Sequence, residues 1–341
     1  MSQLDPRTEQ QYWAAHKNAA VVDRSDLGRI AMVGRDCLDL LHRLSTQDLL
    51  HVQSGQGTRT VLTSDKGRIL DVLTVYRMVD RLILLTSPDR QADTLAWLDR
   101  YTFSEDSAAS DLTPNTGLLA VLGPKAVDVA ERAAGQSVAG LEKYEHVESQ
   151  IAGVPVTIAR AHEPLDGLQV LVHDRERLAE VMEALLTVGA PLGVQRIGPA
   201  AYEVLRIEAG IGAYGRELGE QYNPLEAQLR DSISFRKGCY IGQEVIARLD
   251  SYQKVQKLQM GLLLPPGEVP STGTKLIAEG KEVGLVTSAT VSPALGRPIA
   301  LAYVAFKAAK AGMSLALETS PESHAAQVVD LPFTEVAAAR S

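Results

Sequence analysis

The stretch that decides the fold is residues 257–291, KLQMGLLLPPGEVPSTGTKLIAEGKEVGLVTSATV. Short apolar segments alternate in it with Pro265-Pro266-Gly267 and Gly280, residue types that end strands. The same spacing continues to residue 331. It predicts six strands: Lys257–Leu264, Lys275–Ala278, Val283–Val291, Ile299–Phe306, Met313–Leu317 and Gln327–Leu331. Six short strands with regular turns are typical of a small β-barrel.

The chain before this stretch mixes helices and strands. Ile69–Tyr76 and Leu82–Thr86 predict a hairpin, and Ser87 with Pro88 predicts the N-cap and first residue of the next helix. Further segments follow the same alternation: a helix over 34–44, strands over 118–122, 154–159 and 168–173, and helices over 175–186 and 199–209, the last ended by Gly210. This ferredoxin-like order predicts an α+β class. We expect residues 1–254 to form a module of two interleaved subdomains and residues 255–341 to form the barrel.

Composition narrows the classes of function. The 341 residues carry a net charge of −8 and only 5% aromatic residues, so we expect no direct nucleic-acid contact. No apolar run approaches the about 18 residues of a membrane-spanning helix. The polar first nine residues do not follow the order of a signal peptide. With only Cys37 and Cys239, a disulfide framework and a four-thiolate cluster within one chain are both excluded. These features predict a cytoplasmic protein.

Glu208 is a carboxylate on the apolar stripe of the predicted helix 199–209, in its last turn. An acid at a helix C-terminus opposes the helix dipole and is rarely buried without a partner. Two explanations remain open at this point. Glu208 pairs with an arginine such as Arg206, or it accepts hydrogen bonds from a ligand that presents adjacent N–H donors.

A second candidate site surrounds Cys239. Gly238 and Gly242 allow a sharp turn on either side of the thiol. The cations Arg236 and Lys237 favour a thiolate, which predicts a reactive cysteine, whereas isolated cysteines are more often small buried side chains. Arg236, Lys237 and Arg248 either hold ligand carboxylates or are solvated surface charges.

Asp71 is a lone acid in the apolar strand 69–76, and marks either a sheet edge or a functional acid. The chain lacks the glycine-rich phosphate motifs, and its seven histidines show no metal-ligand spacing. We therefore predict no metal site.

Several of these segments together resemble the glycine-cleavage T-protein superfamily along almost the whole chain. They are residues 26–30 (DLGRI), 57–76, 206–210 (RIEAG), 283–288 (VGLVTS) and 292–293 (SP). Within that superfamily, residues 237–244, KGCYIGQE, match all eight positions of the signature of the YgfZ branch. The resemblance implies a ring of three domains, two ferredoxin-like and one barrel, around a channel that binds tetrahydrofolate.

The resemblance also implies roles for individual residues. Glu208 matches the pterin-binding glutamate. Asp71 matches the first aspartate of a pair whose second, catalytic member is replaced here by Val72. The resemblance assigns folate contacts to Glu208, Arg206, Lys237, Tyr240 and Arg248. The residues of the signature motif are Lys237, Gly238, Cys239, Tyr240, Gly242, Gln243 and Glu244. Cys239 is the candidate reactive residue, with Asp71 a weaker one.

The function implied is an accessory role. YgfZ-type proteins bind tetrahydrofolate and support the assembly or repair of iron–sulfur proteins, including radical enzymes that modify tRNA. The expected partners are folate and iron–sulfur assembly factors or client proteins. The alternative is a folate-dependent aminomethyl or one-carbon transferase. A third possibility is a folate-binding scaffold in which Cys239 is structural.

Overall fold

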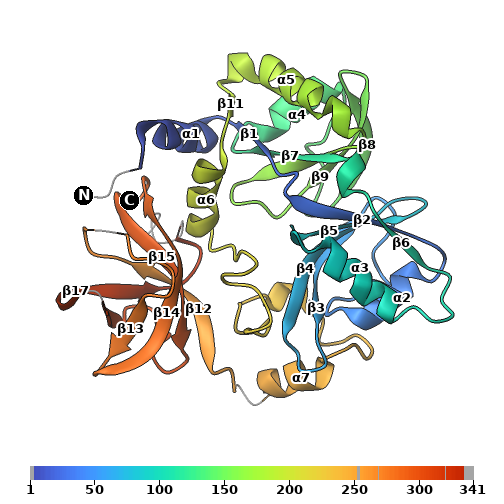
Figure 1. The fold of residues 1–341 in the computed structure, drawn as a ribbon. Helices are drawn as coiled ribbons and strands as arrows, with labels where there is room; N and C mark the ends of the chain where they lie inside the picture. Colours follow the sequence, from blue (N-terminus) through green and yellow to red (C-terminus); the bar gives the residue numbers. More distant parts are fainter. Residues whose placement is uncertain (1–3, 252–253, 268, 319, 334–341) are drawn as a thin grey trace. The chain divides into compact units, whose positions relative to one another are not determined.

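The computed structural model describes residues 4–251, 254–267, 269–318 and 320–333. Figure 1 shows the elements along the chain. Two units are distinguished by their internal contacts: unit 1 comprises Met1–Tyr12, Pro199–Arg230 and Glu244–Ser341, and unit 2 comprises Trp13–Gly198 and Asp231–Gln243. Each unit is therefore built from segments that are not consecutive in the sequence. The boundary that the sequence places between residues 254 and 255 stays a prediction.

Unit 2 contains two sheets, the first antiparallel throughout and the second mixed. The five-stranded sheet has the order β3-β4-β5-β2-β6 and the six-stranded sheet the order β11-β1-β7-β10-β9-β8. The strands of the first are β2 (Leu27–Val33), β3 (Gly57–Thr63), β4 (Ile69–Arg77), β5 (Leu82–Pro88) and β6 (Ala108–Asp111). Those of the second are β1 (Ala20–Asp23), β7 (Gly117–Leu122), β8 (His146–Ile151), β9 (Val154–Arg160), β10 (Gly167–Val172) and β11 (Gln195–Arg196).

Helices cover one face of each sheet in unit 2. Helices α2 (Cys37–Leu44) and α3 (Gln91–Arg100) bury their apolar sides on the five-stranded sheet, where Leu40 and Leu41 meet Leu73. Helices α4 (Ala126–Ala134) and α5 (Leu178–Gly189) cover the six-stranded sheet in the same way (Figure 1). Single-turn helices lie at Thr113–Asn115, Arg175–Arg177, Ala190–Leu192 and Arg230–Ser232.

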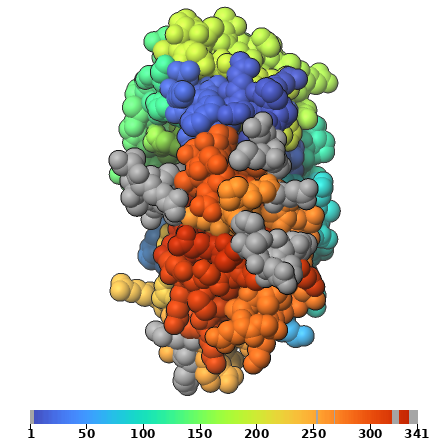
Figure 2. All heavy atoms as spheres, turned by 90° about the vertical axis from the view of Figure 1, so that its left-hand side faces the viewer, coloured from blue at the N-terminus to red at the C-terminus, as the bar shows by residue number. Residues whose placement is uncertain are grey.

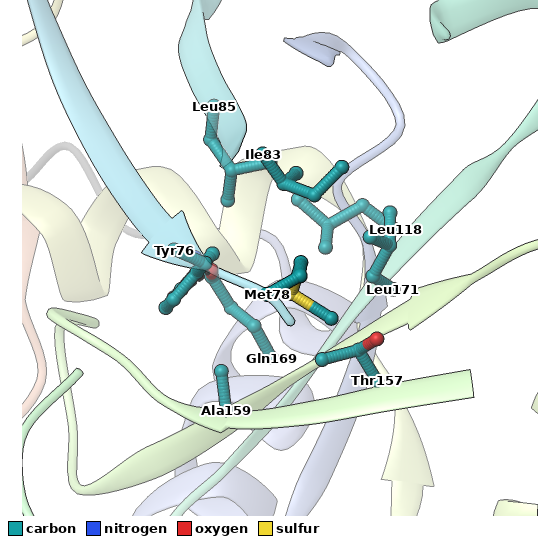
Figure 3. Close-up of a pocket in the computed structure, with 9 residues that line it drawn as sticks. All are labelled: Tyr76, Met78, Ile83, Leu85, Leu118, Thr157, Ala159, Gln169 and Leu171. Carbon is teal, nitrogen blue, oxygen red and sulfur yellow. Dashed lines mark hydrogen bonds between the residues drawn. The ribbon is translucent and has the colours of Figure 1, made fainter. Parts of the chain in front are cut away.

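The helix-free faces of the two sheets meet in an apolar layer. Tyr76 and Ile83 of one sheet contact Leu118 and Leu171 of the other. Figure 3 shows the side chains around a cavity of about 10 Å³ in this layer, about the space of one water molecule. The Tyr76 hydroxyl donates to Gln169 there at 3.0 Å. Because the layer is packed this tightly, it fixes the position of each sheet.

The predicted hairpin is confirmed, but the predicted helix start is wrong. Strands β4 and β5 pair in antiparallel register. Ser87 and Pro88 continue β5, since Leu27 of β2 pairs with Pro88, and α3 begins only at Gln91. A serine–proline pair satisfies a helix start and a strand end equally well, and the pairing with β2 decides between them.

Unit 1 is built on the predicted barrel. Six strands close in the order β12-β15-β14-β13-β16-β17, which confirms the α+β class with a C-terminal barrel. The strands are β12 (Lys257–Leu263), β13 (Lys275–Ala278), β14 (Lys281–Ser292), β15 (Arg297–Ala305), β16 (Ser314–Leu317) and β17 (Ser320–Val329). Figure 2 faces the barrel, drawn in orange to red. Helix α1 (Pro6–Lys17) contributes its residues up to Tyr12 to this unit.

Helix α6 (Pro199–Glu208) packs on this barrel. Its Ile207 is fully buried against Leu263, Ile299 and Leu301 of the strands. Gly210 ends the helix with a φ of +70°, as the sequence predicts, and a Cβ there would lie 2.9 Å from Leu331. Helix α7 (Gln243–Ser251) precedes the barrel in the chain. The packing of α6 places its last residue, Glu208, at the barrel wall.

Candidate functional site

Glu208 is held at the barrel wall by hydroxyl groups. Its side chain is only 4% exposed. The Tyr12 hydroxyl donates to both carboxylate oxygens, at 2.8 and 3.0 Å, and the Ser292 hydroxyl donates to one of them. Burial, followed by the charge of Glu208, raises the pKa of Tyr12 far above its usual value, so the phenol stays a donor.

The Tyr12 and Ser292 hydroxyls orient the carboxylate as neutral donors. A carboxylate offers about four acceptor sites, and each of the two hydroxyls supplies one proton. The chemistry suits recognition of a ligand that presents N–H groups side by side. Helix α1 supplies Tyr12 and the end of β14 supplies Ser292. Three parts of unit 1 that lie far apart in the sequence therefore meet at this carboxylate.

Arg206 belongs to a separate buried cluster. Its guanidinium donates to Glu203 at 2.6 and 2.8 Å and to Glu217 at 3.2 Å. The Ser288 hydroxyl accepts from Arg206 at 2.9 Å and donates to Glu217 at 2.6 Å. The sequence left open a pair between Arg206 and Glu208. The structure instead gives Arg206 two other carboxylates, one of them, Glu217, fully buried.

Asp71 faces the helix-covered side of its sheet. It pairs with Leu62, which packs with α2, whereas Val72 pairs with Val61 on the opposite face. The Asp71 carboxylate accepts from the backbone N–H of Val72 at 2.8 Å and of Ser87 at 3.2 Å. Burial raises its pKa to about 6. The two positions that resemble the aspartate pair of the T-protein therefore point to opposite sides of β4.

Lys237 points into unit 2. Its ammonium donates to the backbone carbonyls of His42, Ser45 and Gln47, the last two at 2.7 and 2.8 Å. These carbonyls lie at and just beyond the end of α2, where a cation also complements the helix dipole. Burial lowers the pKa of Lys237 to about 8. A folate-binding role for Lys237 stays a prediction, and it requires the ammonium to leave these acceptors.

The rest of the signature forms a fixed loop with the thiol outside. Tyr240 is buried with its ring centroid 5.1 Å from the Lys237 ammonium, and burial raises its pKa to about 12. The Ile241 carbonyl accepts from the Thr63 hydroxyl at 2.6 Å. At Gly242 φ is +84°, and a Cβ there would lie 2.5 Å from the Ser64 carbonyl oxygen. Cys239, between these anchors, is exposed.

The remaining predicted residues lie around the start of α7. Gly238 is exposed, and an added Cβ would meet nothing within 4 Å. Gln243 and Glu244 form the first turn of α7, and Arg248 is exposed near its end. Unit 2 therefore brings Lys237, Cys239 and Tyr240 together in one loop, while Glu208 and Arg206 share a helix of unit 1 but enter different networks.

Sequence reasoning missed the partners of Glu208 and Arg206. Tyr12 lies 196 residues before Glu208, and no local pattern links them. Tyr12 is fully buried on a helix that also carries the apolar residues Trp13, Ala14 and Ala15, so the pattern of this helix does not single it out. Among the described residues, no group of three or more His, Cys, Asp or Glu side chains is arranged to hold a metal ion, and no helix is long and apolar enough to cross a membrane.

Comparison with known proteins agrees with this architecture. Residues 2–237 match the model of the GCVT N-terminal domain, and residues 257–335 match the glycine cleavage T-protein C-terminal barrel domain. An aminomethyltransferase of Streptomyces avermitilis is 31% identical over 95% of this chain and 88% of its own length. One from Nostoc sp. is 30% identical over 94% and 86%.

Two further relatives extend the comparison. A putative chloroplastic transferase of Arabidopsis thaliana is 31% identical over 94% of this chain and 72% of its own length. The crystal structure of the glycine cleavage system aminomethyltransferase T from Bartonella henselae superimposes with a TM-score of 0.86 at 25% identity, over 96% of this chain and 89% of that one. With both family domains matched in order, this chain belongs to the glycine-cleavage T-protein family.

Proposed function

We propose that this chain binds a reduced folate, and that the Glu208 carboxylate accepts the amino and ring N–H groups of its pterin. The observation that carries the proposal is the fixed orientation of Glu208 between the Tyr12 and Ser292 hydroxyls. Family membership supports it, because relatives across the family are named aminomethyltransferases. Tetrahydrofolate or a derivative is the proposed cofactor.

Replacing Glu208 with glutamine should weaken tetrahydrofolate binding by at least about 100-fold, since two charge-assisted hydrogen bonds become neutral or are lost. The glutamine keeps an acceptor for the Tyr12 hydroxyl, so the fold is preserved. Isothermal titration of both proteins measures the effect. Glu220→Gln, at an exposed carboxylate of the same unit, is the matched control and should bind like the wild type. Equal affinities for Glu208→Gln and wild type, or no binding by wild type, would refute the proposal.

Two activities are candidates for the bound folate. The names of the relatives favour folate-dependent aminomethyl transfer. The register of β4 favours a YgfZ-type accessory role toward iron–sulfur proteins, because Val72 offers no carboxylate on its face while Asp71 lies on the other. The exposed Cys239 on its fixed loop supports the accessory role as well, since a client protein has access to the thiol.

A transfer assay separates the two candidates. We expect the wild-type chain to move a one-carbon unit from an aminomethyl or methylamine donor to tetrahydrofolate at least about 100-fold more slowly than Val72→Asp, the contribution typical of a positioned acid. Val72→Asn is the control, because it adds polarity without an ionisable group. Transfer by the wild-type chain at enzymatic rates would instead establish the transferase.

A further inference from the structure

Strand β14 is joined to the last turn of α6 through two serines. The Ser288 hydroxyl accepts from Arg206 at 2.9 Å, and the Ser292 hydroxyl donates to Glu208. The two serines are buried, with exposures of 1% and 0%. Four residues of strand separate them, a span of about 13 Å. The helix is therefore attached to the strand at two well-separated points.

A β-bulge in β14 turns Ser288 towards the helix. Val286 pairs with Ala302 and Ser288 pairs with Leu301, so Thr287 is the extra residue of the bulge. Val286 belongs to the apolar core inside the barrel. Because the residues of a strand alternate between its faces, Ser288 would share the inner face of Val286 if the bulge were absent. The bulge places Ser288 on the outer face instead, and bulges are frequent beside functional sites, where they re-aim a side chain.

The two attachments fix the rotation of α6 about its own axis. Ile207 packs against Ile299 and Leu301 of the barrel wall. Its neighbours Arg206 and Glu208 leave the helix about 100° to either side of Ile207. A hydrogen bond on one side alone would let the helix roll on Ile207. With a serine bonded on each side, any roll stretches one of the two hydrogen bonds.

The attachment at Arg206 is part of a closed set of hydrogen bonds. Ser288 accepts from Arg206 and donates to Glu217 at 2.6 Å, and Arg206 donates to Glu217 at 3.2 Å. Glu217 is fully buried and also accepts from the backbone N–H of Ala213 at 2.9 Å. Removing the Ser288 hydroxyl breaks two of the three bonds of this set. Because Arg206 and Glu217 keep other partners, the variant that lacks this hydroxyl should fold.

We propose that Ser288 and Arg206 are positioning residues for the Glu208 carboxylate. They act on it through the helix, because the rotation of α6 sets the direction in which Glu208 presents its acceptors. A binding side chain must be held within about 0.5 Å of its productive geometry, and hydrogen bonds behind it supply that precision. The ligand, a reduced folate, rests on the proposed function, whereas the positioning of the carboxylate does not.

The test compares two ligands that differ in their contact with Glu208. Wild type and Ser288→Ala are titrated calorimetrically with tetrahydrofolate and with 2-desaminotetrahydrofolate, which lacks the pterin amino group. We expect Ser288→Ala to weaken tetrahydrofolate binding by about 10-fold and binding of the desamino compound by about 3-fold or less, because that compound makes fewer bonds to the carboxylate. A loss of stability alone would weaken both ligands equally, so the preference for tetrahydrofolate is the quantity that decides.

Thr274→Val is the matched control for this test. It also removes a buried hydroxyl of unit 1, one that donates to the Ser271 carbonyl at 2.8 Å, and it should leave both affinities unchanged. Arg206→Lys keeps the charge but loses the planar set of donors, so it should lower the preference for tetrahydrofolate as Ser288→Ala does. This second variant decides the question if Ser288→Ala does not fold.

The proton NMR resonance of the Tyr12 hydroxyl reports on the carboxylate in the absence of ligand. Tyr12 is fully buried and donates to both carboxylate oxygens of Glu208, and the variant Tyr12→Phe identifies its signal. We expect this resonance to shift in Ser288→Ala, because the carboxylate moves relative to the phenol. It should keep its position in Thr274→Val.

The outcomes separate this proposal from the proposed function. Where wild type prefers tetrahydrofolate, an unchanged preference in Ser288→Ala overturns the positioning role, even if both affinities fall. If wild type binds neither ligand, or both equally, the folate proposal fails and the Tyr12 resonance decides. A shift in Ser288→Ala that is absent from Thr274→Val then supports the positioning role, and an unmoved resonance, or the same shift in both variants, overturns it.

Discussion

Replacing Lys237 with methionine should lower the free energy of unfolding by about 3–5 kcal/mol. Methionine keeps the length and the apolar volume of the side chain but donates no hydrogen bond. The carbonyls of His42, Ser45 and Gln47 would then lose a shared charged donor, and each buried acceptor left unpaired costs about 1–3 kcal/mol. Urea unfolding of both proteins, compared at constant slope, measures the difference.

Lys66→Met is the control for this experiment, because Lys66 is an exposed lysine of the same unit. Exposed substitutions change stability by about 0.5 kcal/mol or less. If Lys237→Met unfolds with the same midpoint as Lys66→Met, the ammonium does not hold the end of α2. The result matters for the signature, since it decides whether its first residue serves the fold of the Cys239 loop or a ligand.

Arg206→Met should destabilise the protein by about 3–5 kcal/mol, the usual cost of breaking a buried ion pair. The loss leaves Glu217, which is fully buried, without the cation that faces it at 3.2 Å. Thermal and urea unfolding measure the change. The double variant Arg206→Met with Glu217→Gln should recover part of the loss, because glutamine removes the stranded charge.

Arg216→Met is the matched control for this cluster. Arg216 also binds Glu203, at 2.7 Å, but its side chain is 42% exposed, and exposed ion pairs contribute about 1 kcal/mol or less. If Arg216→Met lowers the free energy of unfolding as much as Arg206→Met, burial is not the reason why the cluster stabilises the protein. A double variant no more stable than Arg206→Met would likewise show that the charge of Glu217 is not the cause.

The barrel was predictable because its strands carry their own pattern. Residues 275–278 were placed without error, and the other five strands within a few residues except at the start of β17. Strand β6, Ala108–Asp111, carries no such pattern, because its sequence AASD is small and polar. It forms only because β2 pairs with it. Strands defined by their neighbours cannot be read from their own residues.

The residues of the candidate site also differ in whether the sequence predicts them. Glu208 was predictable because an acid on an apolar helix face is a local anomaly. Its partner Tyr12 and the acceptors of Lys237 were not, since they lie 190 or more residues away in sequence. The cytoplasmic location and the absence of direct nucleic-acid contact stay predictions.

The interleaving of the chain has a consequence for how the molecule is made. The ribosome adds Tyr12 long before Ser292, yet both hydroxyls meet on one carboxylate. Residues 13–198, most of unit 2, leave the ribosome long before that. Unit 2 can therefore acquire its sheets while the chain grows, whereas the Glu208 arrangement is completed only after β14 has been synthesised. A polypeptide cut short before Ser292 retains the strands of unit 2 and lacks the finished carboxylate site.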